Sequence, residues 1–217
     1  MYRVIYADPP WKYGQNRYQE RRKGLSPDHK YPVMSTKDIC ELPVSNLADD
    51  DCALFVWTTD AHLQDCMKVI SAWGFEYRTI AFVWVKRYPS GKPRVLVAPW
   101  TLKSTEICLL GIKGSPKRAS KNIRALIEAE VKQDSQKPDE AHERIEKMFG
   151  EVSRLELFAR RPRNGWSVFG NEVEGSIRLP TKHAPDVWDS AASTSIILPS
   201  EVSAVQADSS PAHTQVM

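Results

Sequence analysis

The residues best suited to chemistry lie close to the amino terminus, in the run Asp8, Pro9, Pro10 and Trp11. The two prolines fix their own φ angles and lack N–H groups, so the exposed carbonyls of this run can only accept hydrogen bonds. Asp8 adds a carboxylate acceptor, and Trp11 adds a flat face suited to stacking on a base. The ligand that best matches these acceptors is an amino group on an aromatic ring, which presents two N–H donors in the ring plane. The same residues also fit an ordinary turn after a strand, with Trp11 covering the core.

An aromatic amine held by two acceptors becomes a better nucleophile. Accepting both protons draws the nitrogen toward sp³ geometry and frees its lone pair, and a nearby carboxylate favours a cationic methyl donor such as a sulfonium. Methyl transfer would then be a direct in-line displacement, with proximity lowering the barrier by up to ~7–11 kcal/mol. We expect no metal site, because the five histidines are scattered and the four cysteines form no C-x-x-C pair.

The surrounding sequence predicts an α/β sheet that presents this run at its edge. Short apolar runs predict buried strands at 3–7, 53–57, 80–85, 106–112, 155–159 and 166–169. Capping residues and apolar spacing predict helices at 36–41, 60–73 and 138–149, while 123–131 fits a strand or a helix equally. In the second helix we expect Asp60 as the cap and Leu63, Met67 and Ile70 as the buried face. Ligands of open α/β sheets bind beyond the carboxyl ends of the strands, where the run after 3–7 must lie.

Composition divides the chain into two unlike parts. The 217 residues are 41% hydrophobic and 26% charged, which is ordinary for a globular domain, and no apolar stretch approaches the ~20 residues of a membrane span. Ser, Thr, Ala and Pro fill half of residues 178–217. We therefore predict a folded domain over 1–177 and a largely disordered tail over 178–217. Widely spaced cysteines favour reduced thiols and a cytoplasmic location.

The net charge of the whole chain is +3. Residues 1–177 carry +5, because residues 178–217 contain two basic and four acidic residues. Basic residues gather in two segments, which we expect to flank the catalytic strand ends and to contact a phosphate backbone. The first segment holds Arg17, Arg21, Arg22, Lys23 and Lys30, and the second holds Lys113, Lys117, Arg118, Lys121 and Arg124. Two solvated loops are the alternative interpretation. A base in a duplex would have to be flipped out before it could stack on Trp11.

An ordered series of motifs resembles the MT-A70 family of adenine-N6 methyltransferases, which use S-adenosylmethionine and carry the DPPW motif. The matching blocks are 8–11, 31–35, 54–57, 83–86, 106–114, 137–140, 155–160 and 165–172, and the likeness runs from about residue 2 to 175. The resemblance implies a Rossmann-like methyltransferase fold, with a mostly parallel sheet and helices on both faces. It also implies a permuted order, in which the catalytic motif precedes the cofactor motif.

The resemblance assigns a role to each matching residue. Asp8 and the Pro9 carbonyl would hold the adenine amino group, Pro10 would shape the turn, and Trp11 and Tyr31 would lie beside the base. The implied cofactor-binding residues, with Asp8 nearby, are Lys137 for the methionine carboxylate, Phe158 for packing, Arg160 for the ribose hydroxyls, Asn171 and Glu172 for the nucleoside, and Asn164. The alternative interpretations are surface charges for Lys137 and Arg160 and a simple turn after a strand for the Asn171–Glu172 pair.

These residues support three functional hypotheses. The leading one is an S-adenosylmethionine-dependent DNA adenine-N6 methyltransferase, and the second is the same chemistry on adenosine in RNA. The third is a non-catalytic nucleic-acid-binding partner of a methyltransferase. A homo- or hetero-oligomer is open under each hypothesis. Relatives of that third kind tend to lose the acid or the aromatic residue of the motif, whereas Asp8 and Trp11 are both present here.

Overall fold

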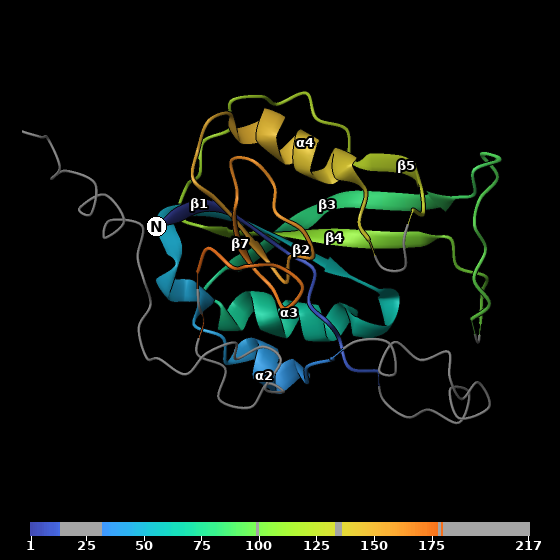
Figure 1. The fold of residues 1–217 in the computed structure, drawn as a ribbon, viewed down its shortest axis with the longest axis horizontal. Helices are drawn as coiled ribbons and strands as arrows, with labels where there is room; N and C mark the ends of the chain where they lie inside the picture. The colour runs from blue at the N-terminus through green and yellow to red at the C-terminus, as the bar shows by residue number, and fades with distance from the viewer. Residues whose placement is uncertain (14–31, 99, 133–135, 178, 180–217) are drawn as a thin grey trace, which may run out of the picture.

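The computed structural model describes residues 1–13, 32–98, 100–132, 136–177 and 179. The described residues form a seven-stranded sheet in the order β5-β3-β4-β2-β1-β6-β7, with α4 on one face and α2 and α3 on the other (Figure 1). The strands are β1 (Tyr2–Ala7), β2 (Ala48–Thr58), β3 (Glu76–Arg87), β4 (Thr105–Lys113), β5 (Leu126–Glu130), β6 (Arg154–Leu157) and β7 (Ser167–Phe169). The helices are α2 (Thr36–Cys40), α3 (Leu63–Ala72) and α4 (Asp139–Phe149), with 3-10 turns η2 (Val44–Asn46) and η3 (Asp60–His62).

The strand directions confirm the predicted Rossmann-like methyltransferase fold with a mostly parallel sheet. β1 pairs in parallel with β2 and β6, β6 with β7, and β3 with β5. β4 is antiparallel to both of its neighbours, β2 and β3, and is the only reversed strand among the described elements. Its first residues therefore lie at the same edge as the last residues of the other strands.

The register of β1 brings three chain segments together at this edge. Ala7, the last residue of β1, pairs with Val56 of β2 and with Leu157 of β6. β1 and β6 both end at this level, whereas β2 continues for two residues to Thr58, paired with β4. Asp8 therefore lies between the end of β2 and Phe158, as the position of the motif after a central strand predicts.

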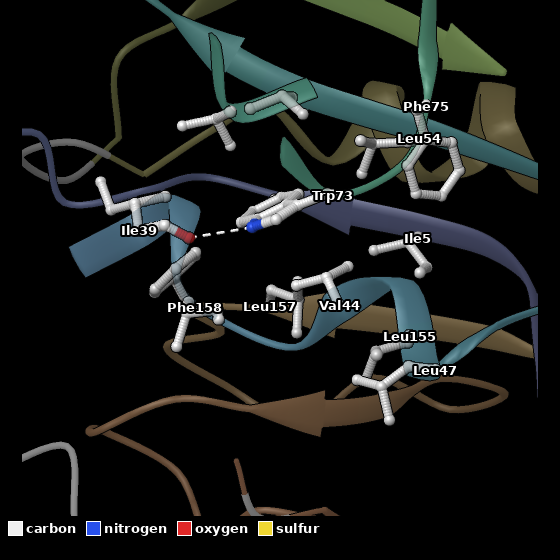
Figure 2. Packing of buried hydrophobic residues seen from close by; sticks show 14 of the residues in the cluster. Ile5, Ile39, Val44, Leu47, Leu54, Trp73, Phe75, Leu155, Leu157 and Phe158 are labelled. Carbon is white, nitrogen blue, oxygen red and sulfur yellow. Dashed lines mark hydrogen bonds between the residues drawn. The ribbon is translucent and has the colours of Figure 1, made fainter. Parts of the chain in front are cut away.

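Alternating side chains of the sheet build a core on each face. Ile5 and Ala7 point into the layer shared with α2 and α3, while Val4 and Tyr6 point into the layer shared with α4. Figure 2 shows the first layer, where Trp73 Nε1 donates to the carbonyl of Ile39 at 2.9 Å. That bond fixes the short helix α2 against the end of α3.

The predicted limits of the first and last helices are close to those observed. Ser35 and Asp38 form the expected capping box of α2, with each side chain accepting from the other residue's backbone N–H. α4 follows Pro138 and ends at Gly150, whose φ of +66° suits glycine. Residues 123–131, which fitted either element, contain the strand β5.

The prediction for the face of the second helix is correct for Ile70 and wrong for Leu63 and Met67. Residues 60–62 form the turn η3, whose preceding residue Thr59 makes no side-chain cap, and α3 begins only at Leu63. Leu63 and Met67 are 41% and 36% exposed, whereas Cys66, Val69 and Ile70 are buried. Cys66, Val69, Ile70 and Trp73, at positions i, i+3, i+4 and i+7, form the buried apolar stripe, and Leu63 and Met67 lie outside it.

The expected boundary after residue 177 divides a single packing cluster. Ile177 and Leu179 are 7% and 4% exposed and both belong to the core layer shared with α2 and α3. Apart from Leu179, the tail predicted over 178–217 lies outside the described residues. All four cysteines are free thiols. Within the described residues no helix has the length and apolar character to cross a membrane.

Candidate active site

A pocket opens at the edge of the sheet where the parallel strands end. It combines the DPPW run with the end of β2, with the segments that follow β6 and β7, with the facing ends of β3 and β4, and with Lys137, two residues before α4. The lining residues are Asp8, Pro9, Pro10, Trp11, Tyr13, Pro32, Trp57, Thr58, Thr59, Lys86, Leu96, Glu106, Lys137, Phe158, Arg160, Asn171 and Glu172.

The DPPW run is held in a fixed turn. The Trp11 N–H donates to the Pro9 carbonyl at 2.9 Å, and the Met34 N–H donates to the Pro10 carbonyl at 2.8 Å. Lys12 N–H in turn donates to the Met34 carbonyl at 3.1 Å. Because a carbonyl oxygen has two lone pairs, Pro9 keeps one acceptor position for a ligand.

Trp11 is anchored by contacts that the sequence did not predict. Its side chain is only 6% exposed, and its Nε1 donates to the Trp57 carbonyl at 3.2 Å. The indole stacks on the imidazole of His62, with ring centroids 5.4 Å apart and planes 13° apart. Tyr13 meets the same imidazole edge-on at 4.5 Å. One face of Trp11 is thus occupied by His62, so base stacking, which remains a prediction, would have to use the rest of the ring.

Four charged side chains form a chain of contacts across the pocket. Lys137 Nζ lies 2.7 Å from Asp8 Oδ2 and 3.7 Å from Glu106 Oε1. Glu106 Oε2 lies 2.9 Å from Lys86 Nζ. The Lys137 ammonium also lies 5.7 Å from the centroid of the Trp57 ring. Two carboxylates and two ammonium groups therefore share one partly desolvated site.

Burial and neighbouring charges shift both carboxyl groups, in opposite directions. Burial raises the pKa of Asp8, and the charge of Glu106 adds to this while Lys137 opposes it. Burial alone would also raise the pKa of Glu106, but Lys137 and Lys86 together hold it below its usual value. Glu106 is thus the fixed anion of the site, and Asp8 is the carboxylate that most readily accepts a proton.

Sequence analysis missed Glu106 and Lys86 as site residues because it gave β4 no direction. A residue at the start of a parallel strand lies at the far edge of the sheet, but the reversed β4 places Glu106 at the pocket, opposite Trp84 of β3. Lys86, two residues beyond Trp84, then reaches the same carboxylate. The signal that could have found them was the lack of a helical pattern in the connection between β3 and β4, which contains three prolines and a glycine. A parallel pair needs a crossover connection, usually a helix, whereas an antiparallel pair does not.

Lys137 takes the position that the sequence predicted, before a helix amino terminus. It precedes Pro138, the residue before α4, and its side chain is 7% exposed. The positive charge and the N–H donors of an ammonium group suit a carboxylate ligand as well as the side chains of Asp8 and Glu106.

Four of the predicted cofactor residues lie on one wall of the pocket. Phe158 directly follows β6 with a φ of +63°, an uncommon conformation for a residue with a side chain. Arg160 Nε lies 3.7 Å from Glu172 Oε1, and both line the pocket with Asn171. Asn164, in contrast, is exposed in a turn and does not line the pocket.

Gly170 allows the two strands of this wall to approach closely. A Cβ at this position would lie 1.9 Å from the carbonyl oxygen of Ala159. The Ala159 N–H also donates to the Phe169 carbonyl at 2.9 Å, which joins the segments after β6 and β7. Only glycine fits here, and the contact sets the position of Arg160 relative to Asn171.

Of the two basic segments predicted to flank the pocket, one lies outside the described residues and the other lies away from the pocket. Arg17, Arg21, Arg22, Lys23 and Lys30, together with Tyr31, lie outside the described residues. The expectation that Lys113, Lys117 and Arg118 flank the pocket is wrong. β4 runs antiparallel and carries Lys113 to the opposite edge, where it pairs in register with Cys52 and donates to the Ala48 carbonyl at 3.2 Å. Ala119, which follows Arg118, bonds to Met148 at the carboxyl-terminal end of α4, also away from the pocket.

Comparison with known proteins agrees with this geometry. The sequence profile of the MT-A70 family matches residues 2–172, which include every residue of the pocket. The chain belongs to the MT-A70 family. It is 35% identical over 198 residues to the type II methyltransferase M.MunI of a Mycoplasma species, covering 83% of this chain and 82% of that protein.

The MT-A70 domain also matches parts of larger eukaryotic proteins. It is 29% identical over 180 residues to the human N(6)-adenosine-methyltransferase catalytic subunit METTL3, covering 79% of this chain and 28% of METTL3. It is 31% identical over 183 residues to an MT-A70-like N(6)-adenosine-methyltransferase of Arabidopsis thaliana, covering 81% of this chain and 24% of that protein. The chain therefore spans most of M.MunI but only about a quarter of these two relatives.

Proposed function

We propose that this protein transfers a methyl group from S-adenosyl-L-methionine to the exocyclic N6 nitrogen of adenine in DNA. The observation that carries the proposal is the position of Asp8, at the end of β1 beside the Pro9 carbonyl and in contact with Lys137. Both acceptors needed for an aromatic amino group are present, and the motif is intact. An intact acidic residue in the pocket favours an enzyme over a non-catalytic binding partner.

The pocket residues suit S-adenosyl-L-methionine. Lys137, just before α4, has the charge for the methionine carboxylate, and the Arg160–Glu172 pair has donors and acceptors for a ribose diol. Phe158 offers an apolar surface on the same wall. When bound, the cofactor supplies an electrophilic methyl group.

The chain's own residues would position the amine and take its proton. The Asp8 carboxylate and the free lone pair of the Pro9 carbonyl accept the two amino protons and orient the nitrogen lone pair. The nitrogen would form its bond to the methyl carbon as the bond between that carbon and the sulfonium sulfur breaks, with S-adenosyl-L-homocysteine as the leaving group. The amine would release one proton, which we assign to Asp8, because its raised pKa makes it the better acceptor. The buried anion of Glu106 keeps Lys137 in place beside Asp8 during this step.

DNA is proposed as the substrate because the relative of similar length, M.MunI, is a type II methyltransferase, a class that modifies DNA. Methylation of adenosine in RNA is the second candidate. The observation that favours it is the match to METTL3 and to the Arabidopsis relative, both of which are named N(6)-adenosine-methyltransferases.

The test is transfer of a tritiated methyl group to DNA and RNA oligonucleotides of the same adenine-containing sequence. We expect transfer to DNA and a loss of about 10²- to 10³-fold in kcat for Asp8→Asn, which removes the charge and keeps the shape. Asp50→Asn is the matched control, because Asp50 is a fully exposed carboxylate at the opposite edge of the sheet.

Two outcomes would contradict the proposal. Transfer to RNA alone would replace DNA as the substrate. No transfer to either polymer, with calorimetry showing that the cofactor binds, would reject the enzymatic function.

A further inference from the structure

The described residues of the connection from β3 to β4, 88–98 and 100–104, extend beyond the sheet at the end where β3 stops (Figure 1). We call this segment the arm. Backbone hydrogen bonds hold its two sides together: Arg94 N–H donates to the Lys86 carbonyl at 2.7 Å, and Leu96 and Lys103 exchange two bonds at 2.7 and 2.8 Å. The arm is therefore an ordered projection.

The arm begins at the active-site pocket and leads away from it. Leu96 lines the pocket, and Lys86, which precedes the arm, contacts Glu106 inside it. A ligand that fills the pocket and continues out of it on this side would meet the arm next.

The outer part of the arm exposes large apolar and aromatic side chains. Trp100 is 96% exposed, Leu102 65%, Val97 55% and Tyr88 45%. An indole so fully exposed makes little contribution to the core, and its two faces are accessible to a stacking partner.

The arm and its base are strongly basic. Residues 86–104 contain five basic residues and no acidic residue. Lys86 pairs with Glu106, Arg87 with Glu128, and Lys103 with Asp60. Lys92 and Arg94 pair with no acidic side chain among the described residues, and Lys92 is exposed. Two cations therefore remain available on the projection that carries Trp100.

Exposed aromatic rings together with unneutralised cations match a nucleic-acid strand. Phosphates attract the cations, and an unpaired base stacks on an aromatic face. A second copy of the arm fits the same surface less well, because contact between two such arms would bring like charges together.

We propose that the arm holds the nucleic-acid strand next to the target adenine, with Lys92 and Arg94 on phosphates and Trp100 stacked on a neighbouring unpaired base. This inference rests on the proposed function, because it takes the polymer that carries the adenine as its ligand. It adds a binding surface that lies outside the cofactor and amine sites.

The first test measures binding of a fluorescein-labelled, adenine-containing single-stranded DNA by fluorescence anisotropy. We expect Trp100→Ala to raise Kd by about 5- to 150-fold, the range for losing one stacked base. Tyr77→Ala is the control, since Tyr77 is an exposed aromatic residue at the start of β3, on the opposite edge. Because Trp100 is almost fully exposed, the melting temperature should not change.

The second test measures the salt dependence of Kd for the double variant K92Q/R94Q. Each phosphate contact contributes about 0.7 to the slope of log K against log salt on a single strand, so the slope should fall by up to about 1.4. The control is R78Q/K147Q, which removes one exposed arginine and one exposed lysine from the opposite edge. With saturating DNA, the kcat of both arm variants should remain close to that of the unaltered protein.

The outcomes separate this inference from the proposed function. If the unaltered protein methylates and binds DNA but the arm variants match it in Kd and slope, the arm inference is overturned while the function stands. If Trp100→Ala leaves Kd unchanged and converts a dimer to a monomer in light scattering, the arm binds a second copy instead. If the unaltered protein neither binds nor methylates nucleic acid, the proposed function fails first.

Discussion

The two edges of the sheet carry ion pairs of the same residue types in very different surroundings. At the carboxyl edge, Lys137 lies 2.7 Å from Asp8, with side chains 7% and 25% exposed. At the amino edge, Lys113 lies 4.0 Å from Asp50, with side chains 30% and 103% exposed. Water screens the charges of the second pair. The charges of the first pair have lost most of their contact with water, so each depends on the opposite charge beside it for stabilisation. The two pairs have the same residue types, so burial is what distinguishes the pair in the pocket from the pair on the surface.

The largest difference between the edges should appear when the lysine is removed. Lys137→Met leaves Asp8 and Glu106 as two partly buried carboxylates without their shared cation, so we expect the free energy of unfolding to fall by about 3 kcal/mol. Lys113→Met should lower it by less than about 1 kcal/mol. Urea denaturation at neutral pH measures both.

Equal losses for the two lysine variants would contradict this comparison. A smaller loss for Lys137→Met at pH 4 than at pH 7 is also expected. The raised pKa of Asp8 means that this carboxyl takes up a proton readily in the folded protein, so its charge needs less compensation in acid.

The sequence predicted those parts of the site that lie directly after a strand or before a helix. Asp8 follows β1 and Lys137 precedes α4, and both positions were clear from an apolar run or a helix start. Phe158 follows β6, although the predicted strand ran to residue 159 and included it. The other residues of the cofactor-side wall of the pocket, which include Arg160 and Glu172, were predicted from the resemblance to the MT-A70 family. Local patterns sufficed here because parallel strands deliver their ends to one edge.

The direction of β4 could not be predicted in this way. An apolar run has the same composition in either direction, so its pairing alone determines which end faces the pocket. Because the direction of β4 was not known, sequence analysis missed Glu106 and Lys86 as site residues. For the same reason it predicted that the segment from Lys113 lies at the edge of the pocket, which is wrong. The stacking of His62 on Trp11 was hidden for a similar reason, since it depends on the turn η3, which sequence analysis took for the first turn of a helix.

Two glycines, one at each edge of the sheet, allow an effect on stability to be distinguished from an effect on cofactor binding. A Cβ at Gly170 would lie 1.9 Å from the Ala159 carbonyl oxygen, and one at Gly114 would lie 2.2 Å from the Asp50 carbonyl oxygen. Gly170→Ala and Gly114→Ala should therefore each lower the free energy of unfolding by about 2 kcal/mol, since a close backbone contact must open. Only Gly170→Ala should weaken binding of S-adenosyl-L-homocysteine in calorimetry, because it displaces the wall of Arg160 and Asn171. Weaker binding in both variants would mean that loss of stability alone explains the effect.

The smallest expected effect is a shift in the pH profile of methyl transfer. Transfer requires the ionised Asp8 carboxylate, whose pKa is raised by burial and opposed by Lys137, so kcat/KM should fall on the acid side of a pKa above the usual value of about 3.9. Lys137→Met removes the opposing charge and should move this limb to higher pH, whereas Lys113→Met should leave it in place. Because kcat/KM reports the free enzyme, a limb that does not move in Lys137→Met would show that another group controls it. The contact between Lys137 and Asp8 would then serve only to hold the carboxylate in position.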